Sequence, residues 1–188
     1  VCAVCGSKTQ TKTIWGRAEC SNNGLLSTPL YKGYIMSNEY TQNRGQYVCV
    51  DEERMVHHRS RFNNDGGNKW YTVEAQCGAL PCGPYVEDRE LACAVCRVND
   101  EHAKKANSVY TRWGSRECDD RRYPANKIYE GYLAGSYYTS SGGGYNNVCL
   151  HEKPTWNEFN DRDQNGARMY GTEYQNTGSL DKNHNRDA

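Results

Sequence analysis

The stretch Cys93-Ala94-Val95-Cys96 lies near the middle of the chain, and the same four residues occur near its start as Cys2-Ala3-Val4-Cys5. The two occurrences are 93 − 2 = 91 residues apart in a chain of 188 residues. A recurrence at about half the chain length indicates an internal duplication. Each Cys-Ala-Val-Cys stretch is therefore expected to begin one of two homologous units, residues 1–92 and residues 93–188.

Three further motifs recur in the second unit at a nearly constant offset. They are Trp-Gly-x-x-Glu-Cys at 15–20 and 113–118, Tyr-x-Gly-Tyr at 31–34 and 129–132, and Val-Cys at 48–49 and 148–149. The offset is 113 − 15 = 98 for the first two motifs and 148 − 48 = 100 for the third. Surface loops tolerate a drift of this size. We therefore predict two tandem repeats related by pseudo-twofold symmetry.

The chain has little apolar material for a core and many cysteines. Hydrophobic residues make up 36% of the chain, and its mean hydropathy is −0.99. A unit of about 90 residues buries only about 60–65% of its surface, so it needs additional stabilisation. An even number of cysteines in such a chain predicts disulfides and an oxidising, extracellular location. The ten cysteines are Cys2, Cys5, Cys20, Cys49, Cys77, Cys82, Cys93, Cys96, Cys118 and Cys149.

The distribution of the cysteines limits their pairing. Cys77 and Cys82 occur only in the first unit, so we predict that they bond to each other as one of five disulfides. The four recurring positions of each unit allow three connectivities. A zinc site is the alternative for the two Cys-x-x-Cys pairs, but zinc usually draws its ligand pairs from within about 12–20 residues of each other. These pairs are 91 residues apart, so no metal or other cofactor is expected.

The strand signals favour an all-β fold, because short segments rich in Tyr, Val, Thr and Trp alternate with Gly, Asn and Asp. The expected strands are 13–20, 30–40, 46–51, 69–77 and 90–98 in the first unit, and 109–118, 128–138, 147–152 and 168–175 in the second. Beyond 175 the chain is polar and has no strand signal. The 23 basic and 23 acidic residues balance, which argues against a nucleic-acid partner. No apolar run is long enough for membrane insertion, and the chain is expected to be a mature, secreted product.

Two corresponding loops, 38–46 and 136–147, combine aromatic, amide and small residues. Sugar rings stack on aromatic side chains, and their hydroxyls need polar partners, so we expect these loops to bind carbohydrate. The alternative is a pair of long hairpin loops in which the glycines only allow positive φ. The candidate residues are Tyr40, Asn43 and Arg44 in the first unit and Tyr138 and Asn146 in the second.

A second candidate region contains His57, His58 and Arg59, and the corresponding part of the second unit contains Trp156. Arginine can bind a sugar carboxylate through two hydrogen bonds, so the first unit is expected to bind an acidic sugar and the second a neutral galactoside. Solvated histidines are the alternative. The segment Asp161-x-Asp163-x-Asn165-Gly166 begins like a calcium loop, but Thr172 stands where the final glutamate is required, which favours a plain turn. No catalytic motif is present, so the protein is not expected to be an enzyme.

The Trp-Gly-x-x-Glu-Cys and Tyr-x-Gly-Tyr motifs, together with Gly142-Gly143-Gly144-Tyr145-Asn146-Asn147-Val148-Cys149-Leu150, resemble the non-collagenous module of short-chain, spongin-like collagens. The two-unit, ten-cysteine layout is similar to the egg lectins of sea hares. The resemblance implies a multivalent, secreted lectin for galactose and galacturonic acid that forms homodimers, agglutinates cells and acts in innate defence. The alternative is an extracellular-matrix or egg-coat structural protein without a sugar site, and a secreted hydrolase is a third candidate.

Overall fold

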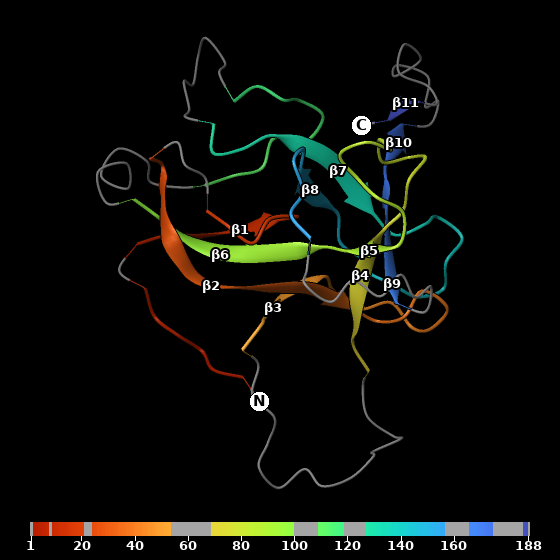
Figure 1. Cartoon of the computed structure of the whole chain (residues 1–188), viewed down its shortest axis with the longest axis horizontal. Coiled ribbons are helices and arrows are strands. Elements are labelled where there is room, and N and C mark those ends of the chain that lie inside the picture. The colour runs from red at the N-terminus through yellow and green to blue at the C-terminus, as the bar shows by residue number, and fades with distance from the viewer. Residues whose placement is uncertain are drawn as a thin grey trace, which may run out of the picture.

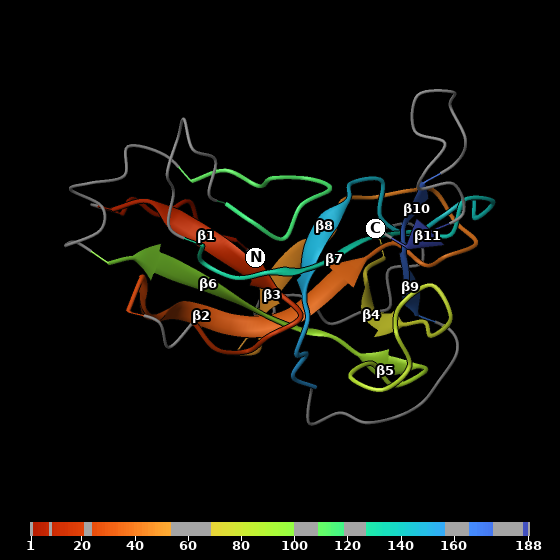
Figure 2. The same cartoon turned by 90° about the horizontal axis from the view of Figure 1, so that it is seen from above.

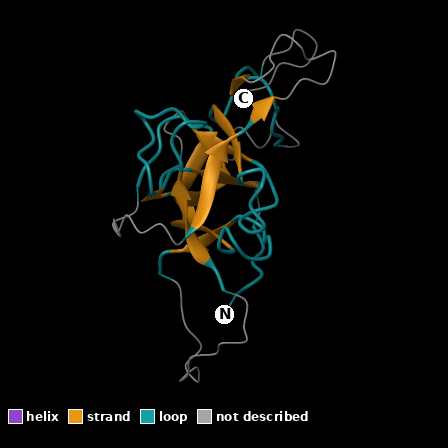
Figure 3. Ribbon diagram, turned by 90° about the vertical axis from the view of Figure 1, so that its right-hand side faces the viewer, coloured by secondary structure: helices purple, strands orange, loops and turns teal. Residues whose placement is uncertain are grey.

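The computed structural model describes residues 2–7, 9–20, 24–53, 69–99, 109–118, 127–156, 166–174 and 186–187. Throughout this part of the chain the regular structure consists of strands, and no helix occurs in it (Figure 3). The prediction of an all-β fold is therefore confirmed. The strands are β1 (Thr11–Trp15), β2 (Leu26–Ser37), β3 (Val48–Asp51), β4 (Tyr71–Ala75), β5 (Arg89–Glu90), β6 (Ala92–Val98), β7 (Gly131–Gly135), β8 (Val148–His151), β9 (Ala167–Gly171), β10 (Glu173–Tyr174) and β11 (Arg186–Asp187).

Seven of these strands close into a barrel (Figures 1 and 2). The sheet has the order β3-β2-β6-β1-β8-β7-β9-β4-β5, and an additional pairing between β2 and β4 closes the circuit of seven strands. The strands β3 and β5 lie outside this closed circuit, and β10 and β11 form a separate two-stranded sheet. Closure removes the exposed edges of a sheet, which suits a chain with so little apolar material.

The strand β6 contains the second Cys-Ala-Val-Cys stretch and lies between β2 and β1. Cys93 is opposite Trp15 of β1 on one side and Gly33 of β2 on the other. Ala94 and Cys96 are fully buried as well. A strand with neighbours on both sides and core on its faces needs a continuous apolar run of small residues, which this stretch supplies. The residues expected to begin the second unit thus complete the sheet of the first.

We call residues 9–98 the first half of the barrel and residues 109–174 the second half. The same pairing pattern occurs in both. In the first half Ile35 is opposite Cys49, and in the second half Leu133 is opposite Cys149. The offsets are 133 − 35 = 98 and 149 − 49 = 100, as in the sequence motifs. The hydroxyl of Tyr31 donates to the backbone oxygen of Cys49 at 3.1 Å, and Tyr129 donates to that of Cys149 at 2.7 Å. The core of β2–β3 therefore has a matching arrangement in β7–β8.

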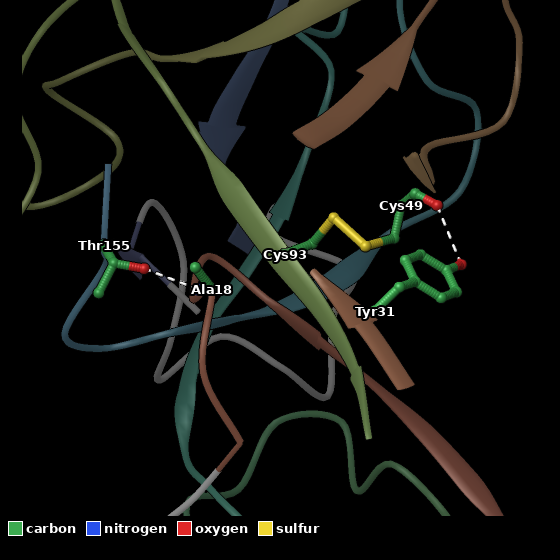
Figure 4. Close-up of a disulfide and its surroundings, with 5 residues drawn as sticks. All are labelled: Ala18, Tyr31, Cys49, Cys93 and Thr155. Carbon is green, nitrogen blue, oxygen red and sulfur yellow. Dashed lines mark hydrogen bonds between the residues drawn. A yellow bond between two sulfur atoms is a disulfide. The ribbon is translucent and has the colours of Figure 1, made fainter. Parts of the chain in front are cut away.

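Two disulfides form in the structure, Cys20–Cys96 and Cys49–Cys93, and Figure 4 shows the second of them. Both join a cysteine of the first half to β6, and they are compatible with an extracellular protein. Two of the five expected disulfides are thus formed, and the other six cysteines are free thiols in this structure. The expected Cys77–Cys82 bond is not formed either, although the two thiols interact with each other. The sulfur of Cys77 lies 3.5 Å from the backbone oxygen of Tyr85, and that of Cys82 lies 4.0 Å from the backbone oxygen of Leu80.

The predicted strand at 109–118 is also wrong, because this segment is irregular. Two of its hydrogen bonds are local: Arg112 Nη1 donates to the backbone oxygen of Glu117 at 3.0 Å, and the nitrogen of Glu117 donates to Ser115 Oγ at 3.1 Å. Side chains from elsewhere also donate to the segment, Lys12 to Thr111 Oγ1 and Lys127 to the backbone oxygen of Arg116. Tyr110 and Trp113 are exposed, although the corresponding part of the first half is strand β1. In contrast, the end of the chain, which had no strand signal, contributes the short strand β11.

Candidate functional site

The two loops expected to carry the binding residues meet in the structure. We call residues 38–47 and 136–147 together the loop cluster. Sequence reasoning assigned one loop to each of two separate sites, but backbone bonds join them directly. The nitrogen of Gly45 donates to the oxygen of Gly143 at 2.8 Å, and the nitrogen of Tyr145 donates to the oxygen of Gly45 at 2.8 Å. The cluster follows β2 and β7, so equivalent strand ends from the two halves of the barrel deliver its two parts.

Two glycines allow this close contact. A Cβ atom at Gly142 would lie 1.9 Å from the backbone oxygen of Glu39, and one at Gly144 would lie 2.1 Å from the ring of Tyr47. Any side chain at either position would push the loops apart. Gly142 and Gly144 therefore serve close packing, and Gly143, with a φ of +83°, serves turn formation.

Tyr47 holds the two loops together from the buried side of the cluster. Its ring is buried, its hydroxyl is 2.7 Å from Ser136 Oγ, and that hydroxyl donates to the backbone oxygen of Arg168 at 2.9 Å. Burial, as the main cause, raises the pKa of Tyr47 to about 12, so it remains a neutral donor at physiological pH. Ser136 Oγ in turn donates to the oxygen of Gly144 at 2.8 Å. Side chain and loop backbone thus form one connected network.

Four of the predicted residues lie in this network or beside it. Arg44 donates through Nε and Nη2 to the backbone oxygen of Ser140, at 3.2 and 2.8 Å. Asn146 Oδ1 accepts from the backbone nitrogen of Tyr47 at 2.8 Å. The guanidinium of Arg168 lies 3.9 Å from the ring centroid of Tyr40, in cation–π geometry. Asn43 is exposed on the same loop.

The outer side of the cluster is aromatic. Tyr138 is 81% exposed, Tyr145 is 64% exposed, and Tyr137 is exposed as well. The rings of Tyr137 and Tyr138 are 4.8 Å apart, and Tyr137 also contacts Tyr170 at 5.1 Å between ring centroids. Exposed rings held on a hydrogen-bonded loop can stack on a ligand without first becoming ordered.

The remaining predicted residues are elsewhere. Trp156 packs against the core, with its ring 6.4 Å from Tyr85 and the guanidinium of Arg89 5.1 Å from its centroid. It is therefore not part of the loop cluster. The residues His57, His58 and Arg59 lie outside the described residues, as does most of the segment that resembles a calcium loop.

Sequence reasoning missed Tyr47 and Arg168 as parts of the site. Tyr47 aligns with Asn147 in the second half, so the duplication gave no signal for it. Arg168 lies on β9, far from either loop in the sequence. Only the folded barrel brings these two side chains to the loops.

Among the described residues, no group of three or more His, Cys, Asp or Glu side chains could hold a metal ion. No helix in that part of the chain has the length and apolar character needed to cross a membrane. Comparison with protein-family models, with curated proteins and with solved structures found no match.

His151, at the end of β8, makes stability depend on pH. Burial, together with Arg17 and Lys153, lowers its pKa to about 4 from the ordinary value of 6.5. The folded state therefore favours neutral His151, while the unfolded chain takes up a proton as soon as the pH falls through 6.5. The stability from this group is present above pH 6.5 and is lost as the pH falls towards 4.

We expect His151→Gln to have a shallower loss of unfolding free energy than the native chain between pH 6.5 and 4. Urea unfolding at a series of pH values measures this slope. Equal slopes in the two proteins would show that His151 does not contribute.

Proposed function

We propose that the protein is a secreted lectin that binds galactose- and galacturonate-type glycans through the loop cluster. The observation that carries the proposal is the exposed tyrosine surface of Tyr137, Tyr138 and Tyr145 on loops held by Tyr47 and by backbone bonds between the two halves. Tyrosine supplies a large apolar face with few rotatable bonds, so ligand stacking costs little conformational entropy. The resemblance of the sequence to sea-hare egg lectins names the sugar class.

Arg44 supports an acidic ligand. It is exposed, and Ser140 holds its guanidinium in place. A guanidinium has five N–H donors, so an anchored Arg44 keeps donors for a sugar carboxylate. In this proposal the acidic function and the tyrosine surface belong to one cluster rather than to two separate sites. We therefore propose one composite site per chain and multivalency through a homodimer, with no cofactor.

We also propose that the matching registers of β2–β3 and β7–β8 reflect two tandem repeats, 1–92 and 93–188, related by pseudo-twofold symmetry. In this view each repeat contributes one loop to the site. The composite site then follows from the duplication, because equivalent loops meet near the symmetry axis.

Tyr138→Ala is expected to weaken galactose binding about 10-fold, taking as a guide the about 1–3 kcal/mol that an aromatic side chain contributes when it stacks on a nucleobase. Folding should be unchanged, because Tyr138 is 81% exposed. Leu30→Ala is the matched control: it removes an exposed apolar side chain near the other end of β2. Calorimetry with galactose and galacturonic acid measures both variants.

A glycan array tests the function itself. Binding to galactose- or uronate-terminated glycans is expected. No binding to any glycan would favour the matrix or egg-coat protein, and hydrolysis of a bound glycan would favour the hydrolase. Equal affinity of Tyr138→Ala and the native chain would move the site away from the loop cluster.

A further inference from the structure

Among the described residues, no strand of the second half takes the place that β6 has in the first half. In the first half, β6 lies between β1 and β2 and bonds to Cys20 and Cys49. The corresponding cysteines of the second half, Cys118 and Cys149, are free thiols. The first Cys-Ala-Val-Cys stretch is also free: Cys2 and Cys5 are exposed, and Val4 is 104% exposed.

We propose that the N-terminal segment 2–5 docks beside 127–132 and 109–113 as the counterpart of β6, forming the disulfides Cys2–Cys149 and Cys5–Cys118 within the same chain. The pairing follows from the sequence offsets between corresponding cysteines. Cys49 corresponds to Cys149 (49 + 100) and Cys20 to Cys118 (20 + 98). Cys93 corresponds to Cys2 (93 − 91) and Cys96 to Cys5 (96 − 91).

The backbone register follows in the same way. In the first half Cys93 is opposite Gly33 of β2 and Trp15 of β1. The same offsets place Cys2 opposite Gly131 and Trp113. Gly131 matches Gly33 closely: a Cβ atom at either residue would lie 1.8 Å from a backbone oxygen of the neighbouring strand. The position is therefore built for the same tight strand packing.

Side chains of the second half are also left uncovered where the counterpart of β6 would lie. Trp113 is 53% exposed, whereas its counterpart Trp15 packs against the core. Burial, as the main cause, raises the pKa of the Cys149 thiol, and the charge interaction with the Cys118 thiol acts in the same direction. Residues 127–130 include Tyr129, which donates to the backbone oxygen of Cys149, and Lys127, which pairs with Glu117. They are not in a strand, although their counterparts 29–32 belong to β2. A docked strand would cover the tryptophan and extend β7.

The chain is long enough to reach this position. The nitrogen of Val98 donates to the oxygen of Gln10 at 2.9 Å, so the chain is held from Gln10 onward. Lys12, two residues later, donates to Thr111 Oγ1 at 3.1 Å. The five residues from Cys5 to Gln10 span up to about 16–18 Å. The segment is therefore tethered beside its proposed site, and tethering gives an effective concentration in about the millimolar range, which favours the same chain over a second one.

Each bond forms when a thiolate attacks a disulfide donor, such as oxidised glutathione or a protein disulfide. A mixed disulfide forms first, and the second cysteine of the pair displaces the remaining donor thiolate. For each new bond two thiols lose two electrons and two protons, and the donor disulfide is reduced to two thiols.

Peptide mapping of the oxidised protein without reductant tests the pairing. Trypsin leaves Cys2 and Cys5 on peptide 1–8, Cys118 on 117–121 and Cys149 on 128–162. We expect these three peptides as one linked cluster that reduction separates. The known bonds provide an internal control, since peptide 90–97 should be linked to 18–32 and 45–54. Separate peptides 1–8, 117–121 and 128–162 would overturn the proposal.

A double variant, Cys2→Ser with Cys5→Ser, separates the proposal from a direct Cys118–Cys149 bond. Alkylation in denaturant without reductant should label Cys118 and Cys149 in the variant but not in the native chain. Protection of both cysteines in the variant would show that they bond to each other. Labelling of both in the native chain would show free thiols.

A gel without reductant tests whether the bonds stay within one chain. The native protein is expected to migrate as a single chain of 21.4 kDa. A band of twice that mass that reductant removes would show that the N-terminal segment docks on a second copy, and would overturn the assignment to the same chain.

Discussion

Replacing Cys49 and Cys93 together by alanine is expected to lower the free energy of unfolding by about 4 kcal/mol. The bond closes a loop with a sequence separation of 44 residues, and the chain-entropy relation gives about 4 kcal/mol for a loop of that length. Cys93 is also fully buried between β1 and β2, within the main core. The bond therefore both restricts the unfolded chain and holds β6 in the barrel (Figure 4).

The second disulfide provides a matched comparison. Cys20–Cys96 has a sequence separation of 76 residues, so replacing both of its cysteines by alanine should cost about 0.5 kcal/mol more on entropic grounds alone. Urea unfolding of the two double variants and the native chain measures all three. A loss below about 1 kcal/mol in either variant would show that the bond does not stabilise the fold.

The sequence predicted the strands that depend on local patterns. Strands β2, β3 and β4 all lie within or overlap the expected ranges, because β-branched and aromatic residues between turn signals favour strands wherever they occur. The exception is 109–118, which carries Val109, Tyr110 and Trp113 yet is irregular. Its counterpart β1 is a strand because β6 pairs along its whole length. Strand propensity alone does not form a strand without a neighbouring strand to supply the hydrogen bonds.

The sequence patterns did not predict how the two units are arranged. The second Cys-Ala-Val-Cys stretch marks a sequence boundary, but Cys93 and Cys96 pack into the first half. The strand pairings that close the barrel determine this position of the two cysteines. They join residues more than 60 positions apart, such as Thr13 and Val95. A disulfide pattern follows from which strands become neighbours, and cysteine spacing leaves several patterns possible.

Several residues of the loop cluster were among the predicted binding residues, but their arrangement was not predicted. Tyr40, Arg44, Tyr138 and Asn146 were expected to bind ligand because of their chemical type. That Arg44 donates to Ser140, 96 residues away, depends on the position of β2 relative to β7. The aromatic and polar composition of a loop therefore suggests a function, whereas the arrangement of the strands determines which loops lie together.

Tyr47 is the residue on which the loop cluster depends most, and Tyr47→Ala is expected to lower the free energy of unfolding by about 3–5 kcal/mol, as for other large aromatic residues in a core. The variant removes the ring that packs under Gly144 and the hydroxyl that binds Ser136 and Arg168. Urea unfolding measures the stability.

Two further variants separate the contributions of Tyr47. Tyr47→Phe retains the ring and removes only the hydroxyl, and should cost about 1–3 kcal/mol because buried partners lose a hydrogen bond. Tyr145→Ala, on the exposed side of the same cluster, should change stability by less than about 0.5 kcal/mol. If Tyr47→Ala were no more destabilising than Tyr145→Ala, the cluster would not be held from its buried side. The exposed tyrosines would then have no rigid support, and the proposed binding surface would have to form when the ligand binds.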